Sequence, residues 1–186
     1  MLSVYVPQDG MLGRVPVEPG ERPPENAVWI DLVSPTVQED KVVEQLLGVA
    51  VPTREEMQEI EVSSRLYVEH GARYMTATLM CQSDTATPKT TAVTFILASH
   101  RLVTVRYDEP RPFAIVEHKL GRACSPKIAG DTVLMDLLDA VIDRSADILE
   151  RIGVEIDQIS HTIFEPEADE TPSYNDVLRR SAARAT

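Results

Sequence analysis

The 186-residue chain is predicted to fold as a layered α/β or α+β sandwich that continues into a long helical hairpin. Three observations predict this class: a run of short β-branched segments, amphipathic helical segments on both sides of that run, and a long unbroken helical pattern near the C-terminus. Because 43 % of the residues are hydrophobic, a chain of this length can build a core, and disorder is not expected.

Short strands account for much of the N-terminal half. Residues 2–7 and 27–32 are apolar runs typical of strands, and the intervening segment 8–26, rich in proline and glycine, is predicted to be an extended surface loop. Short polar links separate the next strands, so we expect antiparallel hairpins. These strands are predicted over residues 66–69, 73–81, 91–98 and 102–107.

Helices are predicted on both sides of this strand run. A threonine followed three residues later by a glutamate, as in 36–39 and again in 53–56, forms a capping box that opens a helix. The first helix should end near Leu47, and the second should be short, with Met57 and Ile60 on its apolar side. A third helix, over residues 113–120, follows the last strand.

The C-terminal part carries an unbroken helical pattern over residues 131–164. At 1.5 Å per residue this helix would be about 50 Å long, more than a small domain can cover, so part of it should project. An acidic turn at 165–172 and a helix over 173–185 would complete a hairpin. We expect two parts, 1–125 as the α/β domain and 126–186 as the long acidic helix with a truncated second helix. The acids of the long helix are Asp136, Asp139, Asp143, Asp147 and Glu150.

Composition excludes several functions. A formal charge of −12 argues against nucleic acid or an anionic lipid surface as partner. The chain shows neither a signal peptide nor an apolar run of about 20 residues, so we expect a soluble protein in the reducing cytosol. Because no P-loop, HExxH, GxGxxG or nucleophile elbow occurs in the sequence, we expect no enzymatic activity.

The acidic helix face admits two interpretations. Carboxylates suit hard cations such as Mg²⁺, so acids of the long helix brought near acids of another helix could hold a hydrated ion. The alternative is an ordinary solvated face, and Glu56 has its own structural explanation as a capping residue. A soluble interaction module, whose acidic helical hairpin docks basic proteins, is the alternative function.

Four stretches carry a resemblance to a known family, and together they cover nearly the whole chain from residue 27 onward. Through these stretches and their order along the chain, the sequence resembles the N-terminal cytosolic domain of the CorA family of divalent-cation transporters, which includes related zinc transporters. The stretches are WIDL at 29–32, residues 52–60 leading into SRLY at 64–67, the strand pair at 91–107, and LLDAVID at 137–143 continuing through LERI at 149–152 to residue 157.

The resemblance implies a cytosolic α/β/α funnel domain, spanning residues 1–125, with a mixed and largely antiparallel sheet. It also implies a homopentamer at the cytoplasmic face of the cell membrane. In that family the hairpin leads to a stalk helix and two membrane spans with a Gly-Met-Asn pore signature. None of these occurs before Thr186, so any membrane contact would be made through further C-terminal sequence.

The resemblance also implies a regulatory metal site between neighbouring subunits. In the family, intracellular Mg²⁺ bound there holds the channel closed. Glu56 matches the first of two adjacent acids, Met57 stands where the family has the second, and Asp139 matches an acid of the long helix. With Asp143 one turn further on, the predicted ligands are Glu56, Asp139 and Asp143. The expected ion is weakly bound Mg²⁺, with Zn²⁺ or Co²⁺ as alternatives, and no organic cofactor is expected.

Overall fold

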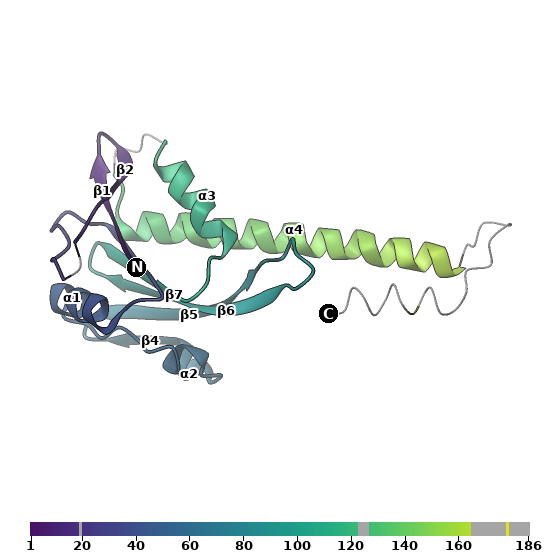
Figure 1. The fold of residues 1–186 in the computed structure, drawn as a ribbon, viewed down its shortest axis with the longest axis horizontal. Coiled ribbons are helices and arrows are strands. Elements are labelled where there is room, and N and C mark those ends of the chain that lie inside the picture. Colours follow the sequence, from purple (N-terminus) through teal and green to yellow (C-terminus); the bar gives the residue numbers. More distant parts are fainter. Residues whose placement is uncertain (19, 123–126, 165–177, 179–186) are drawn as a thin grey trace.

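A computed structural model describes residues 1–18, 20–122, 127–164 and 178, and it shows one mixed sheet with helices on both faces (Figure 1). Among these residues, seven strands lie in the order β2-β1-β3-β7-β6-β5-β4. The elements in chain order are β1 (Leu2–Gln8), β2 (Met11–Val15), β3 (Trp29–Val33), α1 (Val37–Leu47), the 3₁₀ turn η1 (Glu56–Gln58), α2 (Val62–Arg65), β4 (Leu66–Glu69), β5 (Ala72–Cys81), β6 (Lys89–Ala98), β7 (Arg101–Arg106), α3 (Arg111–Leu120) and α4 (Gly130–Phe164).

The sheet is mixed and largely antiparallel, as predicted. Strands β4 to β7 form the expected antiparallel meander, and β1 pairs antiparallel with β3. Strands β3 and β7 run parallel, with Asp31 opposite Thr104. This pairing joins the N-terminal part of the sheet to the meander, although the two strands lie far apart in the sequence.

The prediction of a continuous loop over residues 8–26 is wrong at its start. Strand β2 lies inside that segment and pairs with β1, with Gln8 opposite Met11. Asp9 and Gly10 form the connecting turn with φ values of 50° and 79°. A two-residue hairpin turn of this kind needs positive φ at both positions, which Asp-Gly adopts readily. The prolines further along the segment favoured the prediction of a loop over its whole length, and the short strand was missed.

Helices cover both faces of the sheet, which confirms the α/β/α arrangement (Figure 1). On one face, Val43 of α1 and Met57 of η1 belong to a core cluster with the sheet residues Ile30 and Val103. On the other face, α3 and α4 contribute Phe113, Val116, Val133, Leu134 and Leu137 to a second cluster. The capping box of α1 is formed, because Glu39 N donates to Thr36 Oγ1 at 3.3 Å and Thr36 N donates to Glu39 Oε2 at 2.8 Å.

The second predicted helix is only the 3₁₀ turn η1, followed by the short α2. Met57 is buried as expected, whereas Ile60 is 86 % exposed, so the predicted apolar side is wrong at that position. The chain leaves the helical conformation at Glu59, where ψ is 140°. A helix this short gains too little from packing to continue, because a single side chain anchors it.

Helix α4 begins against the sheet and then projects beyond it (Figure 1). Gly130 N donates to His100 O at 2.7 Å, and a Cβ on Gly130 would lie 2.3 Å from Leu102 N, so only glycine allows this close approach. The last buried residue of α4 is Ile148, whereas Ile152, Val154, Ile156 and Phe164 are exposed. The expected projecting length is therefore confirmed.

None of the helices in the described part of the chain has both the length and the apolar content needed to cross a membrane. The predicted acidic turn at 165–172 lies outside the described residues. The predicted second helix over 173–185 also lies outside them, apart from position 178.

A buried polar network fixes the parallel pair β3–β7. Arg106 Nη2 donates to Asp31 Oδ2 at 2.8 Å, and Thr104 Oγ1 donates to Asp31 Oδ1 at 2.6 Å. Trp29 Nε1 donates to Thr104 Oγ1 at 3.0 Å, so each of the four side chains has a hydrogen-bond partner within the network. The Asp31 and Arg106 side chains are 4 % and 11 % exposed. A charge removed from such a pair would leave its partner buried and uncompensated.

Asp31→Asn should therefore lower the free energy of unfolding by about 3 kcal/mol, because it leaves the Arg106 guanidinium without its counter-charge. Denaturant unfolding measures this difference. The matched control is Asp157→Asn, an exposed acid of α4, which should change the free energy by no more than about 0.5 kcal/mol. Equal effects of the two substitutions would contradict the role given to the buried pair.

Candidate functional site

Glu56 lies on η1, and its carboxylate is oriented by a capping box. Thr53 N and Thr53 Oγ1 donate to Glu56 Oε2 at 2.8 and 3.0 Å, and Glu56 N donates to Thr53 Oγ1 at 3.3 Å. The capping interpretation of this residue is therefore confirmed. Glu56 is nonetheless exposed, so its carboxylate remains accessible to an ion from solvent.

Met57 has the opposite environment, although it is the next residue. Its side chain is 2 % exposed and belongs to the core cluster on the α1 side of the sheet. A carboxylate in that place would lose its hydration without gaining a partner. Met57 therefore anchors η1 to the sheet, and the position where the family resemblance expects a second acid serves packing here.

Asp139 and Asp143 lie one helical turn apart on α4 and line the same groove between α3 and α4. The groove has a volume of about 260 Å³. Both side chains are exposed. Besides these two acids, the charged residues that line the groove are Arg111, Lys119, Asp136, Arg144 and Asp147.

Basic residues of α3 partly neutralise this acidic face. Lys119 Nζ lies 2.7 Å from Asp136 Oδ1. The hydrogen bond to Asp136, with the further negative charges of Asp139 and Asp143, raises the pKa of Lys119 above its ordinary value. Lys119 was missed because nothing in the sequence shows that α3 faces α4.

A second feature missed by the sequence analysis is an arginine clasp around Asp84, in the turn between β5 and β6. Arg111, Arg144 and Arg151 all reach the Asp84 carboxylate, at N···O distances of 2.7, 2.5 and 2.9 Å. Arg144 Nη2 also donates to Ser83 Oγ at 2.6 Å. The clasp ties the turn to α3 and to the middle of α4, next to the groove of Asp139 and Asp143.

The predicted ligands do not converge within one chain. Asp139 and Asp143 share a groove on the α3–α4 side of the sheet, whereas Glu56 lies on η1, which packs on the opposite side. In the described part of the chain, no group of three or more His, Cys, Asp or Glu residues could hold a metal ion. A site that combines Glu56 with Asp139 would therefore need a second copy of the chain.

Comparison with known proteins gives one family and several relatives. Residues 24–183 match the family described as "CorA-like Mg2+ transporter protein". A curated relative, the magnesium transport protein CorA of Escherichia coli (strain K12), is 29 % identical over 167 residues, which are 89 % of this chain and 52 % of the relative. The chain thus spans about half the length of the curated relatives that it matches.

Solved structures show the same fold. The complete CorA magnesium transporter from Methanocaldococcus jannaschii aligns with a TM-score of 0.69 and 13 % identity, over 98 % of this chain and 55 % of that one. The soluble domain of the same protein aligns with a TM-score of 0.66 and 16 % identity, over 98 % and 70 %. At these identities the likeness concerns the fold alone.

The clasp predicts how Asp84 titrates. The hydrogen bond from Arg144 and the neighbouring Arg151 and Arg111 hold the pKa of Asp84 below its ordinary value. A depressed folded-state pKa stabilises the fold above the unfolded-state pKa of about 3.9, and this contribution is lost as pH falls through the folded value.

In carboxyl-detected NMR titrations, Arg144→Gln should raise the titration midpoint of Asp84 above its value in the wild type, because it removes the strongest hydrogen bond to the carboxylate. Arg73→Gln is the matched control, because Arg73 is an exposed arginine of β5 with no part in the clasp. An Asp84 midpoint that is the same in wild type and Arg144→Gln would contradict the clasp.

Proposed function

The chain belongs to the family of CorA-like Mg²⁺ transporter proteins, and on that premise we propose that it is the cation-sensing regulatory domain of a divalent-cation transporter. The observation that carries the proposal is the family match over residues 24–183, which covers both faces of the sheet and the long helix. A transporter family also agrees with the expectation that the chain is not an enzyme.

The proposal extends to the whole transporter. We infer that the complete protein moves Mg²⁺, with Zn²⁺ or Co²⁺ as alternative cargo, and that this domain lies at the cytoplasmic face of the membrane in a homopentamer. Support comes from the curated relatives, which are magnesium transport proteins and of which the aligned part covers 52 % and 53 %. The stalk and the membrane spans would belong to the remaining length.

The placement of the acids supports a metal site between subunits. In a closed ring of identical subunits, each contact is heterologous and joins one face of a subunit to a different face of the next. Glu56 and Asp139 lie on opposite sides of the sheet, so they can belong to the two different faces that such a contact joins. We therefore propose that Glu56 of one subunit and Asp139 with Asp143 of its neighbour share a hydrated Mg²⁺.

Charge explains how such a site would act as a sensor. Facing carboxylates repel, so a bound cation stabilises the closed arrangement by binding it more tightly than the open one. Lys119 and Arg111 reduce the negative charge of the groove and hence the affinity for a cation. Exposed carboxylate sites with water ligands bind at roughly millimolar affinity, which suits an abundant cellular ion.

The alternative, an acidic module that docks basic proteins, has less support. Its acids are partly occupied, since Asp136 pairs with Lys119 and Asp84 pairs with three arginines. A docking surface of this kind needs free negative charge. The groove between α3 and α4 instead contains charges of both signs.

Millimolar Mg²⁺ should increase hydrogen-exchange protection around η1 and around residues 139–143 more than NaCl does at equal ionic strength. Because the site joins two chains, the effect should grow with protein concentration. Asp139→Asn and Glu56→Gln should each abolish the Mg²⁺-specific part. Glutamine retains an oxygen acceptor for Thr53, so capping should survive.

Asp157→Asn, which removes an exposed acid further along α4, is the matched control and should respond to Mg²⁺ like the wild type. Equal protection by Mg²⁺ and NaCl in the wild type would contradict the metal site and show that the acids form an ordinary solvated face. Loss of the Mg²⁺ effect in Asp157→Asn as well would point to bulk charge instead of a site.

A further inference from the structure

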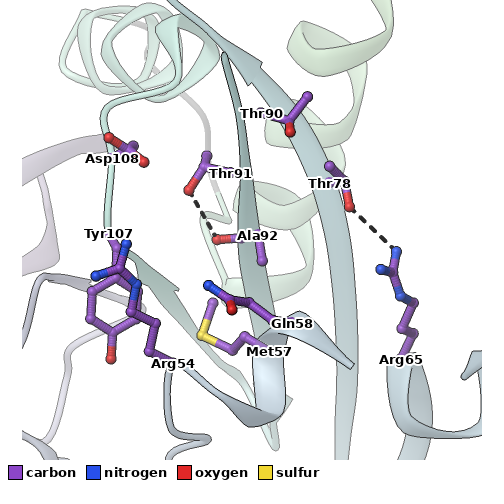
Figure 2. A pocket seen from close by; sticks show the side chains of 10 residues that line it. All are labelled: Arg54, Met57, Gln58, Arg65, Thr78, Thr90, Thr91, Ala92, Tyr107 and Asp108. Carbon is purple, nitrogen blue, oxygen red and sulfur yellow. Dashed lines mark hydrogen bonds between the residues drawn. The ribbon is translucent and has the colours of Figure 1, made fainter. Parts of the chain in front are cut away.

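A second cavity, distinct from the acidic groove, lies between the segment around η1, the strands β5 and β6, and the two residues that follow β7 (Figure 2). Its volume is about 290 Å³, and it opens on the α1 side of the sheet. Two arginines, Arg54 and Arg65, stand on different sides of it in Figure 2. Neither arginine belongs to the proposed metal site.

Neutral partners hold both guanidinium groups. Arg65 Nε donates to Glu59 O at 3.0 Å, and Arg65 Nη1 donates to Thr78 Oγ1 at 3.3 Å. The Arg54 guanidinium carbon lies 5.1 Å from the centre of the Tyr107 ring. Within the described residues, neither arginine forms an ion pair with a carboxylate, in contrast to Arg106, Arg111, Arg144 and Arg151. The cavity therefore contains two guanidinium groups that form no ion pair among the described residues.

Asp108 is the acid that lines this cavity, and its ion pair is with Lys89 and not with either arginine. Its carboxylate lies 2.5 Å from Lys89 Nζ. The hydrogen bond from Lys89 holds the pKa of Asp108 below its ordinary value, so the group stays ionised and paired. Lys89 thus supplies the main counter-charge for Asp108, and Arg54 adds only a weaker electrostatic attraction. The guanidinium groups of Arg54 and Arg65 therefore remain available to an anion.

The other polar groups of the lining are hydrogen-bond donors suited to an anion. Thr78 and Thr90 present hydroxyls from β5 and β6, and Gln58 presents an amide from η1 (Figure 2). Guanidinium groups are the side chains best matched to phosphate oxygens, because they donate paired hydrogen bonds with a fixed geometry and are weakly hydrated. Hydroxyl and amide donors can complete the coordination of such oxygens.

We propose that this cavity binds an anionic ligand of the phosphate class through Arg54 and Arg65. The volume accommodates a pyrophosphate or the terminal phosphates of a nucleotide, and it falls near the lower limit of small-molecule sites. Arg54 and Gln58 flank Glu56 in the sequence, so an anion bound between them would hold η1 in place. The domain would then receive a second chemical input, separate from the divalent cation.

The test is calorimetric titration of the whole chain with sodium pyrophosphate, ATP or adenosine in metal-depleted buffer without chelator. Pyrophosphate and ATP should bind saturably, and adenosine should not. Arg54→Gln and Arg65→Gln should each weaken binding by about tenfold or more, because each removes a charge-assisted donor. ATP binding much tighter than pyrophosphate would identify a nucleotide as the source of the phosphate groups, and equal affinities would identify a simpler phosphate.

Arg73→Gln is the matched control, since it removes the same charge from the opposite face of β5 and should change the affinity less than about twofold. Arg54 is exposed, so Arg54→Gln keeps the test valid even if the loss of Arg65 disturbs the fold. The proposal would be overturned if neither pyrophosphate nor ATP bound saturably below about 10 mM. It would also be overturned if all three variants lost the same affinity, or if adenosine bound as tightly as ATP. Because the buffer contains no divalent cation, failure here would leave the cation-sensing proposal standing.

Discussion

The buried pair of Asp31 and Arg106 is the constraint on which the remaining architecture depends. The strands β2-β1-β3 and β7-β6-β5-β4 meet only where β3 lies beside β7 in the described sheet. A shift of one residue there would turn every side chain of one half to the wrong face. Such a shift would also separate the carboxylate from its guanidinium inside the protein. The pair therefore fixes the register in which the two halves of the sheet join, and with it the continuous surfaces on which the helices of both layers pack.

Local signals predicted the local elements well. The Thr36–Glu39 capping box starts α1, and β-branched segments separated by short polar links identified the meander, because both patterns act between residues close in the sequence. The parallel contact of β3 with β7 joins residues more than 70 positions apart, and only the family resemblance indicated a mixed sheet. The predicted burial of Ile60 was wrong for a related reason. The apolar pattern does not show that the turn ends at Glu59, before Ile60 can reach the core.

The candidate site was predictable to the same extent. Helical spacing placed Asp139 and Asp143 on one face of α4, and capping-box spacing gave Glu56 its partner Thr53. Spacing within one helix does not reveal what another helix presents, so Lys119 was not expected among the acids. The same limit concealed the clasp of Asp84, whose arginines come from two helices. Charge balance at a site is thus a tertiary property, even where the acids themselves follow a local pattern.

The clasp also gives α4 a fulcrum. Gly130 and Arg151 mark the ends of the portion held against the domain, and the 13 residues after Arg151, up to Phe164, extend about 20 Å beyond it. For a stiff rod of that length, a tilt of about 5° at the fulcrum moves the tip by roughly 2 Å, comparable to the helix shifts that accompany switching in other proteins. Small rearrangements beside Asp84 would therefore be amplified mechanically at the far end of the helix.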